Sequence, residues 1–252
     1  MLKNTRTSVW IVVAIMLVLL FWRFPDFFKN PNSRVVEPYG DGYKAYMVIV
    51  NHAKYDSTYS HFEGMNYPYG EHAVPGVTQP LFSISINFLR QNLIDLSDYT
   101  IGIINISMML GLLLCAVFCF LIFKRLGLPT IYSGLVAIGL AFLNPQMERI
   151  GSHYGLSHPE VVPMILYFLM RFEETRKMKW SVAVGLTLWA YSLIHFYYFG
   201  IFAFALGIYF SWTTLRDKNF GVKVILNNLK HFAVQVLVAM VFFLYWIYWH
   251  DP

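Results

Sequence analysis

The sequence is short of charged residues. Only 13% of its 252 residues are Asp, Glu, Lys or Arg, which is about half the share found in ordinary soluble domains. A soluble domain of this length would need far more polar surface than these side chains supply. The scarcity of charge therefore argues against a soluble globular protein. The net charge of +5 does not by itself indicate a nucleic-acid partner, and we expect none.

Cysteine is also scarce, and several catalytic motifs are missing. Both cysteines, Cys115 and Cys119, lie in the apolar run "LLLCAVFCF" at a spacing that places them on one helix face. We interpret them as packing residues, because free cysteine is commonly buried. The chain contains no disulfide framework, zinc motif, phosphate-binding P-loop, nucleophile elbow or dinucleotide fingerprint.

Long apolar segments dominate what is present. Apolar residues make up 57% of the chain and aromatic residues 18%, and several runs approach the roughly 20 residues that cross a bilayer as a helix. The pattern predicts an all-α, polytopic membrane bundle of about seven transmembrane helices. The predicted spans are 8–24, 99–123, 128–144, 159–172, 180–196, 197–212 and 231–249.

The distribution of basic residues predicts a cytoplasmic N-terminus. With this orientation, 12 of the 19 basic residues lie on the cytoplasmic side, accompanied there by only three acids, Glu173, Glu174 and Asp217. The short loops "FKRLG" and "RFEETRKMKW" carry most of the signal, because positive charge in short loops stays inside. The first span has no small-residue cleavage site after it, so we expect an uncleaved anchor. We treat residues 1–252 as one module. Because the chain ends just after the last span, we expect it to be the N-terminal part of a longer protein.

Residues 25–98 form a large outer loop between the first two spans. Tyr43, Tyr46, Met47 and Val50 follow helical spacing, which predicts a helix that starts beside Asp41, with Asp41 as its N-cap in the simplest interpretation. A second helix is predicted over 81–93, with Leu81, Ile84, Phe88 and Leu89 or Leu93 forming an apolar face on the membrane surface. The segment between the two helices is rich in Gly and Pro and predicts turns.

This organisation resembles the GT-C superfamily of membrane glycosyltransferases. The resemblance rests on the topology and on Asp41 in "GDGYK", which matches the acidic residue that the family carries early in its first outer loop. The segments "YDSTYSHFEGMNYPYGEH" and "ERIGSHYGLSH" also resemble uncharacterised Bacteroidetes multi-pass members of the superfamily. Many members have a long soluble outer domain after the spans, and this chain departs from that pattern.

The resemblance implies transfer of a sugar from a polyprenyl-phosphate-linked donor at the outer face of a bacterial inner (cytoplasmic) membrane. Asp41 is then the expected catalytic carboxylate, as a proton acceptor or as a ligand for a divalent metal ion on the donor phosphate. Glu37 is the next carboxylate in line. Lys44 and Arg149 are the cationic candidates for the donor phosphate.

The short second outer loop, "NPQMERIGSHYGLSHPE", is unusually polar for a membrane boundary. Such residues are costly there unless they line a cavity, so we expect Glu148, Arg149, His153 and His158 to help bind substrate. The five-residue spacing of the two histidines does not favour a shared metal ion. A metal cluster of His52, Asp56, His61, Glu63 and His72 follows no standard spacing, and we expect ordinary loop packing for those residues.

Two other functions stay open. The chain fits a non-catalytic subunit or scaffold of the same fold, and it fits a transporter less well. A transporter is expected to place charged or polar groups inside its spans, whereas the predicted span centres here carry almost only Asn105, Ser107, Ser192 and Gln235.

Overall fold

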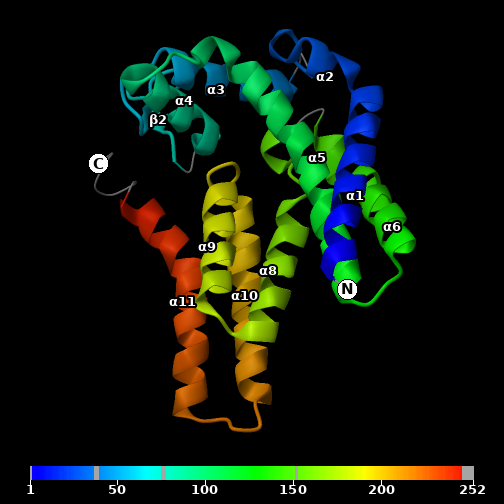
Figure 1. Ribbon diagram of the computed structural model, residues 1–252. Helices are drawn as coiled ribbons and strands as arrows, with labels where there is room; N and C mark the ends of the chain where they lie inside the picture. Colours follow the sequence, from blue (N-terminus) through cyan, green and yellow to red (C-terminus); the bar gives the residue numbers. More distant parts are fainter. Residues whose placement is uncertain (1, 37–39, 75–77, 151–152, 246–252) are drawn as a thin grey trace.

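The computed structural model describes residues 2–36, 40–74, 78–150 and 153–245, and over these residues the chain is almost entirely helical (Figure 1). A bundle of long helices occupies the lower part of the molecule, and a layer of shorter elements lies across its upper end.

Within the part of the chain that the structure describes, seven helices make up the bundle. They are α1 (Leu2–Arg23), α5 (Thr100–Arg125), α6 (Thr130–Leu143), α8 (Val161–Thr175), α9 (Met178–Ser192), α10 (Tyr197–Arg216) and α11 (Val222–Tyr245). In one half α5 packs against α1, α6 and α8, and in the other half α9 packs against α8, α10 and α11.

Four helices in the described part of the chain are long and apolar enough to cross a membrane, and they support a membrane protein. They contain the segments Arg6–Arg23, Ser97–Arg125, Tyr197–Arg216 and Val222–Tyr245. α6 is apolar but has only 14 residues, or about 21 Å at 1.5 Å per residue. α8 and α9 have 15 residues each. The last long helix begins at Val222, well before the predicted 231, because its first turns are polar enough to be missed by an apolar-run criterion.

The upper layer contains the predicted helices of the outer loop, which are confirmed. Its elements are α2 (Pro25–Lys29), the 3₁₀ helix η1 (Pro31–Ser33), α3 (Gly40–Lys54), β1 (His61–Phe62), β2 (Glu71–His72), α4 (Pro80–Asn92) and the 3₁₀ helix η2 (Ser97–Tyr99). The two short strands pair antiparallel, with His61 opposite His72. The second outer loop forms α7 (Gln146–Arg149) and the 3₁₀ helix η3 (Tyr154–Leu156).

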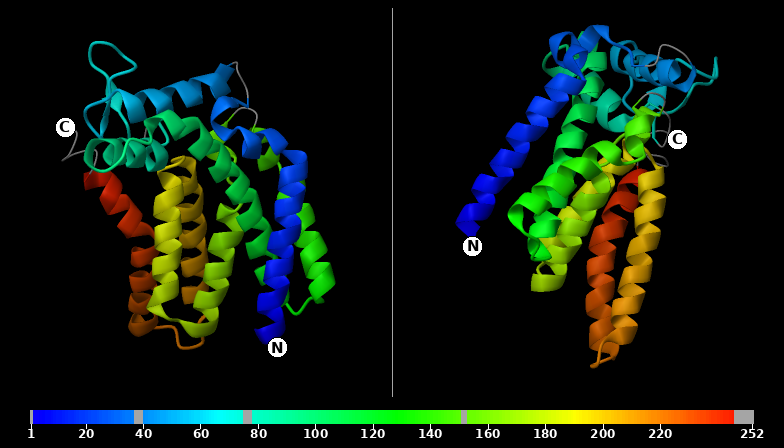
Figure 2. Two further views of the ribbon diagram at one scale, coloured as in Figure 1. Left: turned by 45° about the horizontal axis from the view of Figure 1, so that its top comes forward. Right: turned by 90° about the vertical axis from the view of Figure 1, so that its right-hand side faces the viewer.

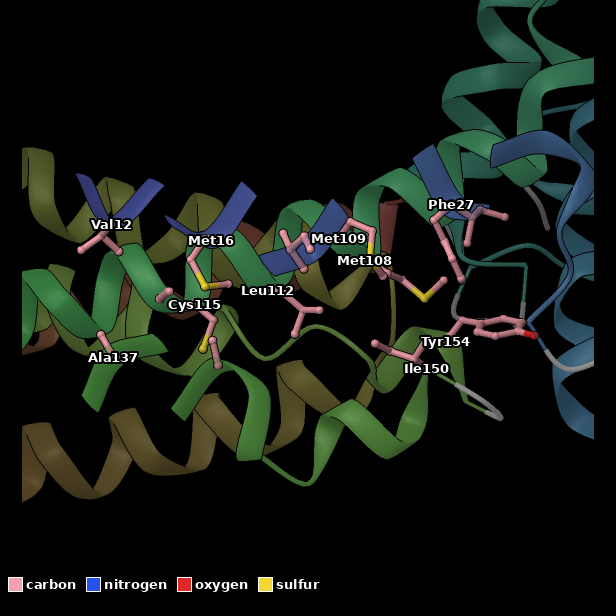
Figure 3. Close-up of a cluster of buried hydrophobic side chains, with 14 of the residues drawn as sticks. Val12, Met16, Phe27, Met108, Met109, Leu112, Cys115, Ala137, Ile150 and Tyr154 are labelled. Carbon is pink, nitrogen blue, oxygen red and sulfur yellow. The ribbon is translucent and has the colours of Figure 1, made fainter. Parts of the chain in front are cut away.

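The largest apolar cluster joins α1, α5 and α6 to the upper layer (Figure 3). Met16 of α1 and Met108 and Leu112 of α5 are fully buried in it, and Tyr154 of η3 closes its upper end. Cys115 lies in the same cluster, and both cysteines are free thiols. Burying each of these large side chains stabilises the fold by roughly 1.5–3 kcal/mol.

The predicted apolar face of α4 is divided between packed and exposed side chains in the structure. Leu81 and Ile84 do pack against the upper ends of α9 and α11, in a cluster with Leu193 and Phe243. Phe88, however, is about half exposed. The side of α4 that is buried against α3 is partly polar and includes Ser83 and Asn87, because these groups contact the α3 end of the loop.

Candidate functional site

Asp41 lies in the first turn of α3, on the upper surface of the molecule. The helix begins one residue earlier at Gly40, whose φ of +58° favours glycine. Asp41 is therefore inside the helix rather than its N-cap residue, and its negative charge is stabilised there by the helix dipole. Its side chain is 72% exposed, so the carboxylate is accessible from outside the bundle.

The second outer loop places a histidine opposite this carboxylate. Nε2 of His153 lies 3.9 Å from Oδ2 of Asp41, and the His153 side chain is 43% exposed. The two residues come from different outer loops, so the structure brings together two of the residues that the sequence selected. A protonated imidazole at this distance attracts the carboxylate, but exposure to water keeps the attraction weak.

His195 adds a third polar side chain from a third segment. It lies in the turn between α9 and α10, and its ring is next to Gly155, directly above η3. Burial and the nearby His153 lower the pKa of the His195 imidazole below its ordinary value, so its neutral form is favoured. In the sequence, His195 stands at the outer end of the predicted span 180–196, which by itself indicates an ordinary interfacial histidine. The signal for its position was the short "HFYYFG" turn, which puts it at the same end of the bundle as the outer loops.

Aromatic packing holds the second outer loop against α3. The rings of Tyr46 and Tyr154 lie 4.3 Å apart between centroids, and both side chains are buried. Tyr46 also donates a hydrogen bond to the side chain of Asn105 on α5, and Asn105 donates to the carbonyls of Pro31 and Arg34. Burial raises the pKa of Tyr46 above its ordinary range, so the hydroxyl stays protonated. These contacts hold the second outer loop, which carries His153, against α3, which carries Asp41.

The remaining predicted residues around this pair occupy different positions. Lys44 lies one turn after Asp41 and lines a pocket of about 340 Å³ together with Tyr43, Met47 and Phe62. Glu148 and Arg149 are both exposed on α7. The Arg149 carbonyl accepts a hydrogen bond from the backbone N–H of His153 at 2.9 Å, which ties α7 to the pair. Glu37 lies outside the described residues.

His158 does not join the Asp41–His153 pair at the surface, because its own side chain is buried. Its Nδ1 contacts Oε1 of Glu160 at 2.9 Å, and the hydroxyl of Tyr191 on α9 donates to the same oxygen at 2.7 Å. Glu160 is only 2% exposed, and its other oxygen sits over Gly111 of α5, where a Cβ would approach it to 2.5 Å. Phe82 of α4 stacks on the His158 ring. This cluster links α5, α8, α9 and α4. In the sequence only the closeness of His158 and Glu160 in "HPE" indicates it.

The residues that the structure describes do not build a metal centre. None of the groups of His, Cys, Asp and Glu side chains among them has three or more members placed to hold a metal ion. In the outer loop, Nδ1 of His52 contacts Oδ2 of Asp56 at 2.6 Å and its Nε2 faces the Tyr59 carbonyl at 3.2 Å. Both side chains are buried, so this pair packs the loop, as the sequence predicts.

Comparisons of the chain with protein-family models, with curated proteins and with solved structures found no match.

Proposed function

We propose that this protein is a GT-C type glycosyltransferase. It transfers a sugar from a polyprenyl-phosphate-linked donor to an acceptor hydroxyl at the outer face of a bacterial cytoplasmic membrane. The observation that carries the proposal is the Asp41–His153 pair, in which an accessible carboxylate faces an imidazole from another loop. The pair lies at the end of a helical bundle that is apolar enough to sit in a membrane.

In the proposed reaction Asp41 is the general base. Its carboxylate takes the proton from the acceptor hydroxyl while the acceptor oxygen forms a bond to the anomeric carbon of the donor sugar. The bond between that carbon and the phosphate oxygen breaks, and the polyprenyl phosphate leaves with the electron pair. His153 orients the carboxylate from the opposite side. A positioned general base typically contributes 10²–10⁴-fold in rate.

Cationic side chains are assigned to the phosphate of the donor. Lys44 is exposed, follows Asp41 by three residues and therefore lies on the same side of α3. Arg149 is exposed on α7, next to His153 through their backbone hydrogen bond. Both are candidates to neutralise the charge that develops on the leaving phosphate.

The proposal includes seven spans with the N-terminus in the cytoplasm. The three shorter helices α6, α8 and α9 then cross where the bilayer is locally thinned, which costs fractions of a kcal/mol per Å of mismatch. In Figure 1 the N-terminus and the loops after α5, α8 and α10 lie toward the lower end of the bundle. The basic residues of those loops, such as Arg125, Arg176 and Arg216, favour the cytoplasmic side.

The experiment is a transfer assay in proteoliposomes with a labelled polyprenyl-phosphate sugar. Asp41→Asn removes the charge and keeps the size of the side chain. Asp98→Asn is the matched control, since Asp98 is also in the outer loop and is 73% exposed, paired with Lys54. Under the proposal Asp41→Asn loses transfer and Asp98→Asn keeps it. A non-catalytic subunit or a transporter would show no transfer in the wild type under any donor tested.

A further inference from the structure

A large open groove lies far from the proposed site, between α10 and α11. It encloses about 1,030 Å³, and Phe204, Trp212, Phe220, Leu229 and Phe232 form most of its apolar wall. The lower ends of α10 and α11 project beyond those of α8 and α9 (Figures 1 and 2), so the neighbouring helices do not cover this region. Because both helices are apolar enough to cross a membrane, the groove opens toward the hydrocarbon chains of lipids.

Basic side chains surround the lower end of the groove. The Arg216 guanidinium lies 5.4 Å above the ring of Trp212, a groove residue. Lys218 lies in the turn between the two helices, and Lys223 lies in the first turn of α11, on either side of Phe220 in the sequence. Among the described residues none of these three cations has an ion-pair partner. The nearby Asp217 uses its carboxylate to accept a hydrogen bond from the Asn219 backbone.

The position of these charges along the membrane normal suits a phosphate group. α10 has 20 residues, which span about 30 Å at 1.5 Å per residue. That length equals the hydrocarbon thickness of a bilayer, so Arg216 lies at the boundary when Tyr197 lies at the other. Arg176 reaches the same region, where its guanidinium contacts Asn228 at 3.5 Å and pairs with Glu173.

We propose that this groove binds an anionic glycerophospholipid from the leaflet on the N-terminal side. Its acyl chains lie against the aromatic wall, and its phosphate contacts Arg216 and Lys218. Apolar grooves with basic rims between transmembrane helices recognise anionic headgroups in this way. The site is independent of the proposed transfer reaction, because it lies at the opposite end of the bundle from Asp41.

The chain offers a matched pair of variants for the groove itself. Gly207 lines the groove, and a Cβ added there would meet no atom within 4 Å. Gly207→Phe therefore places an aromatic ring at the groove from a position where the Cβ itself has room. Gly200, two turns earlier on the same side of α10, is equally open but does not line the groove. Gly200→Phe makes the same chemical change where no lipid is expected.

The test is a titration of the purified full chain in detergent with dioleoylphosphatidylglycerol or dioleoylphosphatidylcholine, followed by native mass spectrometry. The wild type should bind the anionic lipid at least about fivefold more tightly, since each basic residue near a membrane surface is worth about that factor. Arg216→Gln should lose about fivefold, and Arg216→Lys should keep most of the affinity. Gly207→Phe should weaken binding of both lipids, and Gly200→Phe should bind as the wild type does.

Equal affinity for the two lipids, or equal behaviour of Gly207→Phe and Gly200→Phe, would overturn the proposal. Displacement of the lipid by inorganic phosphate alone would also overturn the proposal, because binding would then not depend on the acyl chains in the groove. If the wild type were a dimer and Gly207→Phe a monomer, a second copy of the chain would cover the groove instead of a lipid. Each variant is first checked for helical circular dichroism and a single elution peak. Arg216→Gln changes only an exposed side chain, so it tests the site even if Gly207→Phe fails to fold.

Discussion

At the scale of single residues, buried and half-buried polar groups position the site. His195 is half-enclosed by η3, and its imidazole has a lowered pKa because of burial and the nearby His153. A group whose pKa is lower in the folded state contributes stability that is complete above its unfolded pKa of about 6.5. That contribution is lost as the pH falls through the folded-state pKa, because the unfolded chain binds the proton first.

We therefore expect the wild type to lose thermal stability more steeply than His195→Gln does as the pH falls below about 6.5. The measurement is the unfolding temperature of the detergent-solubilised protein at several pH values. All other residues are the same in both proteins, so only the difference between the two curves is interpreted. Parallel curves would show that His195 does not titrate with folding.

Asn87 makes the second prediction at this scale. Its side-chain amide donates to the carbonyls of His52, Asp56 and Thr58 and is fully buried. Asn87→Ala leaves these acceptors without that donor, which should cost about 1–3 kcal/mol and lower the unfolding temperature. Asn92→Ala, an exposed change on the same helix, is the control. Equal unfolding temperatures for the two variants would contradict the assigned network.

At the scale of elements, two helices of the bundle, α9 and α11, approach each other closely. α9 and α11 meet at Gly185, where an added Cβ would lie 2.6 Å from the Val234 carbonyl. Nearby, Ser181 contacts Nδ1 of His231 at 2.9 Å and accepts a hydrogen bond from Gln235 at 3.2 Å. These hydrogen bonds between side chains join α9 to α11.

Gly185→Ala should therefore push α9 and α11 apart and destabilise the protein by about 1–3 kcal/mol, as overpacking does. Gly139→Ala on α6 is the control, because its Cβ would meet no atom within 4 Å. The measurement is again the unfolding temperature in detergent. If both substitutions were tolerated equally, the close contact of α9 and α11 would be refuted.

The sequence predicted elements better than it predicted faces. Helices α3 and α4 were found from the spacing of apolar residues, since that spacing is a local property of the chain. The buried face of α4 was missed because Asn87 is buried through hydrogen bonds to distant backbone carbonyls, and the small Ser83 is buried on the same side of the helix. Apolar periodicity does not register such bonds. Phe88, on the predicted apolar face, is about half exposed beside Tyr59.

The candidate site was predictable in its residue types but not in its geometry. The acidic residue in a glycine turn and the polar second loop selected Asp41 and His153. Their approach to 3.9 Å depends on how Tyr154 packs on Tyr46, which no short-range pattern reveals. The burial of His158 was not foreseen for the same reason, because its partner Tyr191 belongs to another helix.

At the scale of the whole molecule, the ends of the bundle differ in charge. The prediction of a cytoplasmic N-terminus follows from the basic loops and can be tested with an impermeant thiol reagent in intact cells. In a background without Cys115 and Cys119, Lys177→Cys should react only after lysis. Glu63→Cys, in the outer loop, should react in intact cells. The reverse labelling pattern would show that the N-terminus lies outside the cytoplasm.

The central claim is that Asp41 is the base of a glycosyl transfer. The most direct measurement is the initial rate of sugar transfer from a polyprenyl-phosphate donor by wild type and Asp41→Asn, at matched amounts of folded protein. The account predicts a wild-type rate that falls 10²–10⁴-fold in Asp41→Asn, with Asp98→Asn near the wild-type rate. Transfer by Asp41→Asn within about twofold of the wild-type rate, far short of that loss, would contradict the claim.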